Sequence, residues 1–301
     1  MMYQMSSPKK TYVEDLKNLT TSVCWQLDDT RAVWEFDSTS QKPPKAGDWF
    51  FLVNFPRTGS TVATHILNSH RDVYCGNEYQ TLPLLMTILG SKLFMSPELW
   101  FAVRYTKQLN ITPRNMRHLL EGWRKCISDK PIFGDKGEMY FSRFGAACAA
   151  VFPECKFILT VRNPLDTISS YLKQDWSAYL LMGPTKEYFF RNVQNLVREM
   201  LEGNAFWRDR AEVIEFEQLA SRDGFTETFE RVFHHLGVDP GLFNRDAGWT
   251  LCRHAAAIGR GKQDPVINEF LTWLAAEDNP TYSLITDGVC YAQADRTGKR
   301  G

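Results

Sequence analysis

Short apolar runs recur along the chain, and stretches with helical spacing separate them. The two clearest runs cover residues 49–54 and 156–161, where almost every side chain is apolar, aromatic or β-branched. Such runs are typical of interior strands in a parallel sheet, which are buried on both faces. Shorter runs at residues 71–75, 130–134 and 211–216 predict three more strands. We therefore expect a sheet of five strands.

Helical periodicity follows most of these strands. Val62, Ile66 and Leu67 have the spacing of one helix face directly after the first strand. Further helices are expected at residues 81–127, 142–151, 165–171, 185–203 and 224–236. Strands that alternate with helices imply an α/β fold with a parallel sheet and right-handed crossovers.

The junction after the first strand has the composition of an anion site. It reads Phe55-Pro-Arg57-Thr-Gly59-Ser60-Thr61. A strand that feeds a tight turn at a helix start directs free backbone N–H groups and the positive end of the helix dipole at one point. The junction departs from the nucleotide P-loop, which has Gly where Asn54 stands and Lys where Ser60 stands. Arg57 is its only cation, and the planar guanidinium suits phosphate or sulfate oxygens.

Other polar residues stand at the ends of predicted strands. Glu78, Lys136 and Arg162 each follow an apolar run, as the junction at residues 55–61 does. Ligands of parallel α/β sheets bind at the carboxyl ends of the strands. We therefore expect these residues to gather at one edge of the sheet.

Charge and composition narrow the classes of partner. The 301-residue chain has a net charge of zero and no basic block, so broad attraction to nucleic acid or acidic membranes is not expected. No apolar run is long enough to span a bilayer, and the first ten residues lack the apolar segment of a signal peptide. Seven scattered cysteines without a C-x-x-C pair favour free thiols in a reducing compartment. We expect a soluble, cytoplasmic monomer or homodimer.

The domain organisation follows from length and from one break. The chain is long for a single domain but suits an α/β fold with insertions. Residues 1–47 show no clear period, although Trp25, Trp34 and Phe36 are too apolar for a wholly disordered tail. Two prolines and a glycine within residues 42–47 then interrupt the chain. We expect an N-terminal extension over residues 1–47 packed on the core, and a single α/β domain over residues 48–301.

Two motifs resemble those of the sulfotransferases that use 3′-phosphoadenosine 5′-phosphosulfate (PAPS). Residues 55–61 look like that family's 5′-phosphosulfate loop, and residues 157–171, which begin Phe-Ile-Leu-Thr-Val-Arg-Asn-Pro, look like its 3′-phosphate motif. Residues 213–219 are similar to the family's strand and E-x-L turn, and residues 229–238 to its following helix. The resemblance spans roughly residues 48–245 and is closer to bacterial and carbohydrate-type members than to cytosolic ones. It implies a P-loop NTPase-like sheet flanked by helices, with helical insertions lining the acceptor site.

The resemblance also implies roles for individual residues. Arg57, the backbone N–H groups of residues 58–61 and two hydroxyls would hold the 5′-phosphosulfate, whereas Arg162 and Ser170 would hold the 3′-phosphate. Arg260, in a basic segment that departs from the family's order and spacing, would complete this phosphate site or else lie in an exposed loop. The implied cofactor-binding residues are Arg57, Thr58, Gly59, Ser60, Thr61, Arg162, Ser170 and Arg260.

The catalytic residues are harder to assign. Lys136 resembles a lysine that balances charge on the leaving phosphate, although it would also suit a solvated turn where it pairs with Asp135. Glu78 matches the position of the general base in carbohydrate-type members, and Glu138 stands near the place where cytosolic members carry a histidine. A glutamate can act as this base if burial lifts its pKa toward neutrality. We prefer Glu78 to Glu138, and His65 is the third candidate.

The expected reaction is transfer of a sulfuryl group from PAPS to a hydroxyl or amine of a small molecule. Its transition state should be loose and in line, so positioning and charge stabilisation supply most of the catalysis. The sulfuryl group carries less charge than a phosphoryl group, and the chain has no H-E-x-x-H motif, so we expect no metal. Tyr171 or Phe216 would stack on the adenine. Apolar residues 79–112 and 176–182 would line the acceptor pocket or belong to the core.

Two other classes of function stay open. A P-loop-type small-molecule kinase would explain the strand, turn and helix, but it calls for a lysine after Gly59 and an aspartate where Arg162 ends the fourth strand. A non-catalytic nucleotide-binding protein would bind PAPS without turnover. An esterase is disfavoured because the chain contains no G-x-S-x-G motif.

Overall fold

The computed structural model describes residues 49–77, 113–137, 152, 154–174, 185–255, 259, 261–277 and 279–286. The expected N-terminal extension, the helix over 142–151 and the part of the 81–127 helix before residue 113 lie outside the described residues. Within the described ranges, no helix is long and apolar enough to cross a membrane.

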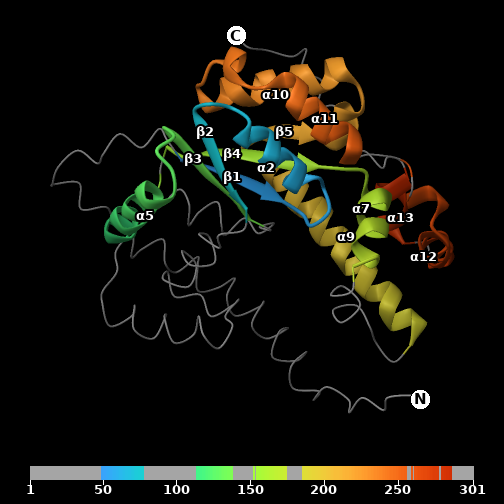
Figure 1. Ribbon diagram of the computed structural model, residues 1–301. Helices are drawn as coiled ribbons and strands as arrows, with labels where there is room; N and C mark the ends of the chain where they lie inside the picture. The colour runs from blue at the N-terminus through green and yellow to red at the C-terminus, as the bar shows by residue number, and fades with distance from the viewer. Residues whose placement is uncertain are drawn as a thin grey trace, which may run out of the picture.

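A single parallel sheet forms the centre of the molecule (Figure 1). Its strands are β1 (Trp49–Asn54), β2 (Val73–Asn77), β3 (Ile132–Gly137), β4 (Lys156–Val161) and β5 (Glu212–Glu215), in the order β2-β3-β1-β4-β5. Strand β1 is central, pairs with β3 and β4, and is buried along its whole length. The α/β fold with five parallel strands is therefore confirmed.

Strands β2 and β3 each begin two residues later than their apolar runs predict. The Lys130 ammonium donates to the backbone carbonyls of Asn68 at 3.1 Å, His70 at 2.8 Å and Val73 at 2.9 Å. Three charged hydrogen bonds use all three of its donors. Lys130 therefore ties the turn before β2 to the chain before β3, and the ladder starts only beyond this contact.

The described helices and short 3-10 helices lie between the strands and, from residue 216 on, after the last strand. They are α2 (Ser60–Asn68), α5 (Pro113–Ile127), α7 (Pro164–Leu172), α9 (Lys186–Arg208), η2 (Phe216–Ala220), α10 (Arg222–Leu236), η3 (Pro240–Leu242), α11 (Arg245–Ala255), η4 (Gly261–Gln263), α12 (Pro265–Ala276) and α13 (Pro280–Thr286). The helices expected at residues 165–171, 185–203 and 224–236 correspond to α7, α9 and α10. Helices α11, α12 and α13 are not among the expected elements.

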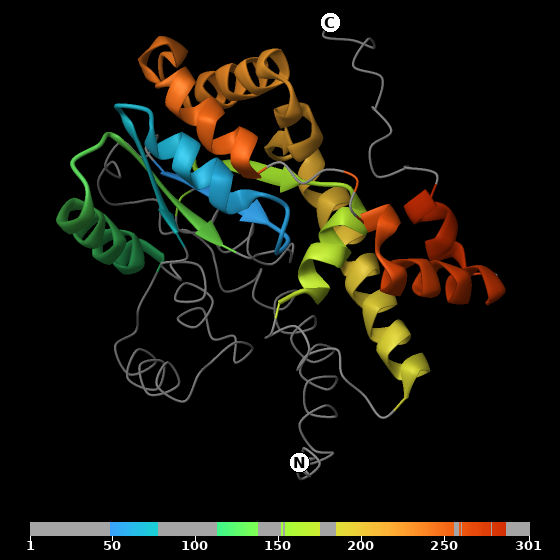
Figure 2. The same ribbon diagram turned by 45° about the vertical axis from the view of Figure 1, so that its right-hand side comes forward.

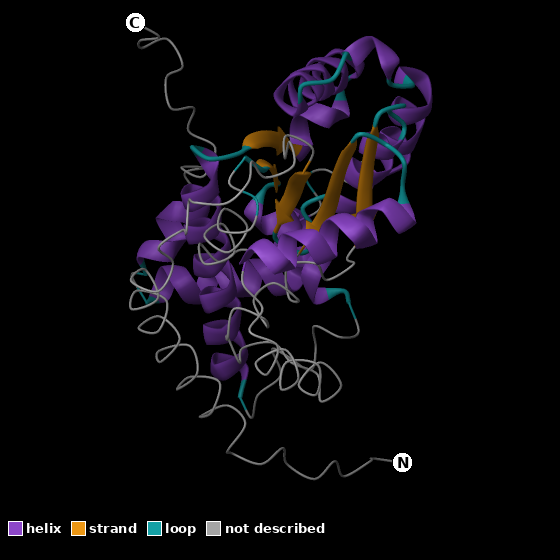
Figure 3. Ribbon diagram, turned by 90° about the vertical axis from the view of Figure 1, so that its left-hand side faces the viewer, coloured by secondary structure: helices purple, strands orange, loops and turns teal. Residues whose placement is uncertain are grey.

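Helices cover both faces of the sheet (Figure 3). On one face, Ile66 of α2 packs in one cluster with Phe229 and Phe233 of α10. The other face carries aromatic side chains: the ring centroids of Trp49 and Phe152 are 4.5 Å apart. Because aromatic pairs add to the stabilisation from area burial, this layer anchors the central strand.

A second apolar core lies beside the sheet rather than on it. It joins α7, α9, α12 and α13 through buried side chains such as Ile168, Phe190 and Phe270. Figures 1 and 2 show α7 between the sheet and the pair α12 and α13. The helix that follows β4 is therefore held from the side opposite the strand ends.

Candidate functional site

The loop between β1 and α2 has a backbone that only glycine accommodates well at one point. Gly59 is the N-cap of α2 with φ of 92°, and no side chain caps the helix. A Cβ atom on Gly59 would lie 2.3 Å from the ring of Phe216. The first backbone hydrogen bond of the helix runs from the Ala63 N–H to the Gly59 carbonyl at 3.0 Å. The N–H groups of residues 60–62 therefore come before the hydrogen-bond ladder, at the positive end of the α2 dipole.

Residues from two separate junctions meet beside this loop. The Arg57 Nε donates to the Ser170 Oγ at 3.2 Å, and the Arg162 Nη1 donates to the Arg57 carbonyl at 3.3 Å. Arg57 is exposed, whereas Arg162 is buried. The structure thus brings together three of the predicted cofactor-binding residues, 113 positions apart in the chain at the widest.

The hydroxyl residues of the loop have different surroundings. The Thr58 Oγ1 donates to the Phe55 carbonyl at 2.8 Å and lies 2.7 Å from the Thr160 Oγ1 on β4. The Thr58 N–H also donates to the Phe55 carbonyl, at 3.3 Å. Buried Thr58 therefore locks the turn onto the neighbouring strand. Ser60 is buried at the start of α2, and Thr61 is exposed.

Lys136 reaches the loop from the adjacent strand. It is 3% exposed, and its Nζ donates to the Thr61 Oγ1 at 3.2 Å. In register it stands between Leu52 of β1 and Asn77 of β2. The predicted lysine is thus part of β3, within hydrogen-bond reach of the predicted phosphosulfate loop.

The junction between β4 and α7 is closed by side chains. The Asn163 Oδ1 accepts the N–H groups of Leu165 at 3.0 Å and Asp166 at 3.3 Å, and Pro164 follows as the first helical residue. The Asn163 N–H itself donates to the Glu217 Oε1 at 2.7 Å. Burial raises the pKa of the Glu217 carboxyl. The sequence signal for this cap, Asn before Pro at a strand end, is visible in retrospect.

Phe216 links the two junctions. Its ring lies under the Arg162 guanidinium, with 4.9 Å from the Arg162 Cζ to the ring centroid, and it fills the space beside Gly59. Tyr171 packs against Phe55 with 5.9 Å between the ring centroids. Both candidates for adenine stacking are only 4% exposed, so each is occupied by packing within the protein. The sequence did not reveal that Phe216 packs against both junctions.

The remaining predicted residues have varied outcomes. Glu78, Glu138 and Arg260 lie outside the described residues, although Glu78 directly follows Asn77, the register partner of Lys136. His65 is exposed on α2. Among the described residues, no group of three or more His, Cys, Asp or Glu side chains could hold a metal ion.

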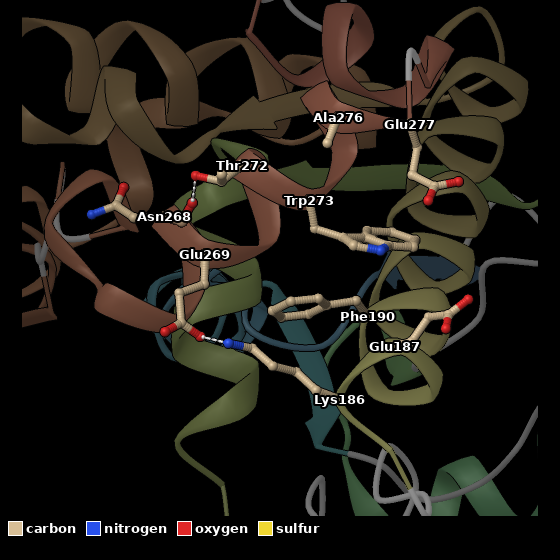
Figure 4. Close-up of a pocket in the computed structure, with 9 residues that line it drawn as sticks. All are labelled: Lys186, Glu187, Phe190, Asn268, Glu269, Thr272, Trp273, Ala276 and Glu277. Carbon is tan, nitrogen blue, oxygen red and sulfur yellow. Dashed lines mark hydrogen bonds and ion pairs between the residues drawn. The ribbon is translucent and has the colours of Figure 1, made fainter.

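A surface pocket between α9 and α12 is separate from these residues (Figure 4). Phe190 and Trp273 form its aromatic wall, and Lys186 bridges to Glu269 at 2.7 Å across it. None of the predicted donor-site residues lines this pocket, so the candidate site is the strand edge around Arg57 and not this pocket.

Comparisons with known proteins give both a sequence relative and similar structures. A relative from Aquifex aeolicus (strain VF5), described as an uncharacterized protein, is 27% identical over 131 residues, which are 42% of this chain and 17% of that protein. The chain is similar in structure to the sulfotransferase domain from the curacin biosynthetic pathway, with a TM-score of 0.51 and 16% identity over 78% of this chain and 99% of that one. A weaker likeness, with a TM-score of 0.48 and 13% identity over 84% of this chain and 89% of that one, is to mouse sulfotransferase SULT7A1 complexed with PAP.

At 16% identity, the likeness to the curacin-pathway domain shows the P-loop-like α/β fold alone. The comparison with protein families also identifies the family of the chain. The model of the Sulfotransferase family matches residues 50–240, which contain both the β1–α2 and the β4–α7 junctions and more than half of the chain. This match supports a sulfotransferase activity, and the chain belongs to the Sulfotransferase family.

Proposed function

We propose that this protein transfers the sulfuryl group of PAPS to a hydroxyl or amine of a small-molecule acceptor and releases adenosine 3′,5′-bisphosphate (PAP). The observation that carries the proposal is the meeting of Arg57, Arg162 and Ser170. Two guanidinium groups from different strand ends at one place suit a ligand with two separate anionic groups. A nucleotide with both a 5′-phosphosulfate and a 3′-phosphate has that charge pattern.

In the proposed reaction, the acceptor oxygen or nitrogen forms a new bond to sulfur as the bond from sulfur to the bridging phosphate oxygen breaks. The electron pair of the broken bond stays on the leaving phosphate, and the acceptor proton goes to a general base. Lys136, held at 3.2 Å from Thr61, supports the proposal because its ammonium is close to the loop that would carry the leaving phosphate. Backbone N–H groups at the start of α2 would stabilise the same charge.

Glu78 is our preferred base, ahead of Glu138 and His65. It follows β2 immediately, and the last residue of β2 is the register partner of Lys136. Glu78→Gln should therefore lower kcat more than Glu138→Gln does, with little change in PAPS affinity, because a glutamine cannot take the acceptor proton. Equal loss in both variants would remove this preference.

We propose that the protein uses no metal and works in a reducing compartment, the cytoplasm. Cys75, Cys126, Cys155 and Cys252 are free thiols. Burial raises the pKa of Cys155 to about 12 and that of Cys252 to about 11, which keeps both as unreactive thiols.

The test is transfer of ³⁵S from labelled PAPS into a library of small hydroxylated and aminated metabolites. Arg162→Ala should weaken PAP binding about tenfold to a hundredfold, because a charged hydrogen bond contributes roughly 1.5–3 kcal/mol. Binding of AMP, which lacks the 3′-phosphate, should stay unchanged. Unchanged PAP binding in this variant would remove the assignment of Arg162.

Arg210→Ala is the matched control. Its guanidinium also lies over an aromatic ring, with 4.2 Å from the Cζ to the centroid of Phe206, but outside the site. It should leave both PAP affinity and ³⁵S transfer as they are in the wild-type protein.

A further inference from the structure

A buried carboxylate on α7 holds a distant segment of the chain. Asp166 is 3% exposed, and its two oxygens each accept one backbone N–H. The Oδ2 accepts from Gly259 at 2.7 Å, and the Oδ1 accepts from Gly261 at 2.6 Å. Short bonds to an ionised acceptor are roughly twice as strong as neutral ones. Asp166 therefore fastens the connection between α11 and α12 to the first turn of α7.

The two glycines allow this close approach. Gly259 has a φ of 80°, a conformation that other L-residues rarely adopt. A Cβ on Gly261 would lie 2.3 Å from the carbonyl carbon of Leu165 and 2.5 Å from the Asp166 nitrogen. The backbone of Gly261 thus lies directly on the backbone of α7, where no side chain would fit.

A second contact extends the same attachment along the helix. Asp264, the N-cap of α12, accepts the Ser169 Oγ at 2.6 Å and the Lys173 Nζ at 3.2 Å. Asp166, Ser169 and Lys173 are spaced by three and four residues, so they share one face of α7. Ser170, the next residue after Ser169, contacts Arg57 instead. Helix α7 therefore connects the donor site to the segment that precedes α12.

We propose that Asp166 is a positioning residue for recognition of the 3′-phosphate: it fixes the chain at Gly259 and Gly261 against the helix that presents Ser170. The inference rests on the proposed function and adds a residue that the family resemblance did not assign. Arg260 stands between the two glycines in the sequence. Loosening both attachment points would weaken any contact that this segment makes with the phosphate.

The first test measures the attachment without any ligand. The N–H groups of Gly259 and Gly261 exchange with deuterium when their bonds to Asp166 open, so their hydrogen-exchange rates report the opening. Asp166→Asn keeps the size of the side chain but turns an amide NH₂ toward one of the two N–H donors. The exchange rate should rise about tenfold, the effect of one lost charged hydrogen bond. An unchanged rate would overturn the proposal.

The second test links the attachment to the 3′-phosphate. The ratio of AMP to PAP dissociation constants should fall about tenfold in Asp166→Asn, because only PAP carries the phosphate concerned. A higher exchange rate with an unchanged ratio would show an attachment of structural importance alone and would overturn the proposal. A wild-type protein that binds AMP as tightly as PAP would contradict the proposed function itself.

Two further variants complete the design. Asp223→Asn makes the same substitution at an exposed residue in the first turn of α10 and should change neither readout. Ser169→Ala removes one hydroxyl from the second contact and should move both readouts in the same direction by a smaller factor. If Asp166→Asn fails to fold, Ser169→Ala decides the question, and no change in its exchange rates at Gly259 and Gly261 would overturn the proposal.

Discussion

The two strand-to-helix junctions of this molecule have the same topology but opposite chemistry. Between β1 and α2, a glycine in the left-handed region starts the helix and no side chain caps it. Between β4 and α7, the Asn163 side chain accepts two N–H groups of the helix, and Glu217 accepts the N–H of Asn163. One helix start is therefore open to an anion, and the other is closed by the protein itself.

The difference between the two helix starts indicates which groups would bind an anion at each junction. At the open junction, backbone N–H groups and the helix dipole are available, so the main chain would take part in binding an anion. At the closed junction those donors are already used, so under the proposed function recognition would depend on the side chains of Arg162 and Ser170. We therefore expect backbone changes to disturb the first junction most and side-chain deletions to disturb the second.

The largest effect should come from Gly59→Ala. The added Cβ would meet the Phe216 ring and would hold an unfavourable φ, so the free energy of unfolding should fall by about 3 kcal/mol. Urea denaturation measures this loss. Because the loop would shift, affinities for AMP and PAP should fall together. A loss restricted to PAP would contradict the division of labour between the junctions.

Gly122→Ala on α5 is the control for that substitution. No atom lies within 4 Å of the position that its Cβ would occupy. A helical glycine is less stable than alanine by roughly 0.5–1 kcal/mol, so this variant should become slightly more stable.

An intermediate effect is expected for Asn163→Ala. Loss of the cap should reduce the free energy of unfolding by about 1 kcal/mol, since two N–H groups of α7 lose their partner. PAP affinity should change by less than about threefold, because the N–H groups of this junction are not the proposed ligands. Ser221→Ala removes a comparable cap from α10, at 3.1 Å from the Gly224 N–H, and should match the stability loss. A large drop in PAP affinity for Asn163→Ala alone would show that the second junction binds through its backbone.

The smallest effect concerns pH. Burial places the pKa of Glu217 higher in the folded protein than in the unfolded chain. The folded state then holds the extra proton, so this carboxyl reduces stability as pH rises from about 4 through its folded pKa. Glu217→Gln can still accept the Asn163 N–H but cannot ionise. Its free energy of unfolding, relative to the wild type, should increase from acid toward neutral pH.

Urea titrations at several pH values would measure this trend. Glu202→Gln, at a side chain that is 73% exposed, is the control for loss of a surface carboxylate. A stability difference between Glu217→Gln and the wild type that is independent of pH would show that the carboxyl is not the group responsible.

Much of the sheet was predictable from sequence because its central strands are apolar throughout. Strands β1 and β4 have the predicted bounds, because nearly all of their side chains are apolar, aromatic or β-branched. Strand β3 extends to Gly137 and includes the charged residues Asp135 and Lys136, both almost fully buried. An apolar pattern cannot reveal charged residues within a strand. They occur at the carboxyl edge of the sheet, where the candidate site is.

The other contacts around the candidate site were harder to predict from the sequence. Arg57 and Arg162 could be placed together because strand ends share an edge, whereas Ser170 was assigned only through the resemblance to the sulfotransferases. The position of Phe216 between the junctions, and the bonds from Asp166 to glycines more than ninety residues away, depend on packing between elements. Local sequence patterns contain no information about such distances along the chain. Helices α11 to α13 were not predicted: they come after β5, where no alternation of strands and helices marks their positions.

Within the described part of the chain, Arg57 is the one residue other than glycine with a positive φ, 73°. Such a conformation costs of order 1–3 kcal/mol in a residue with a side chain. Glycine at this position would remove the backbone strain and raise the melting temperature, yet it would delete the guanidinium that donates to Ser170. Replacing Arg57 by glycine would thus raise stability and damage the proposed site at the same time. Substitutions meant only to stabilise this protein have to be made at other positions.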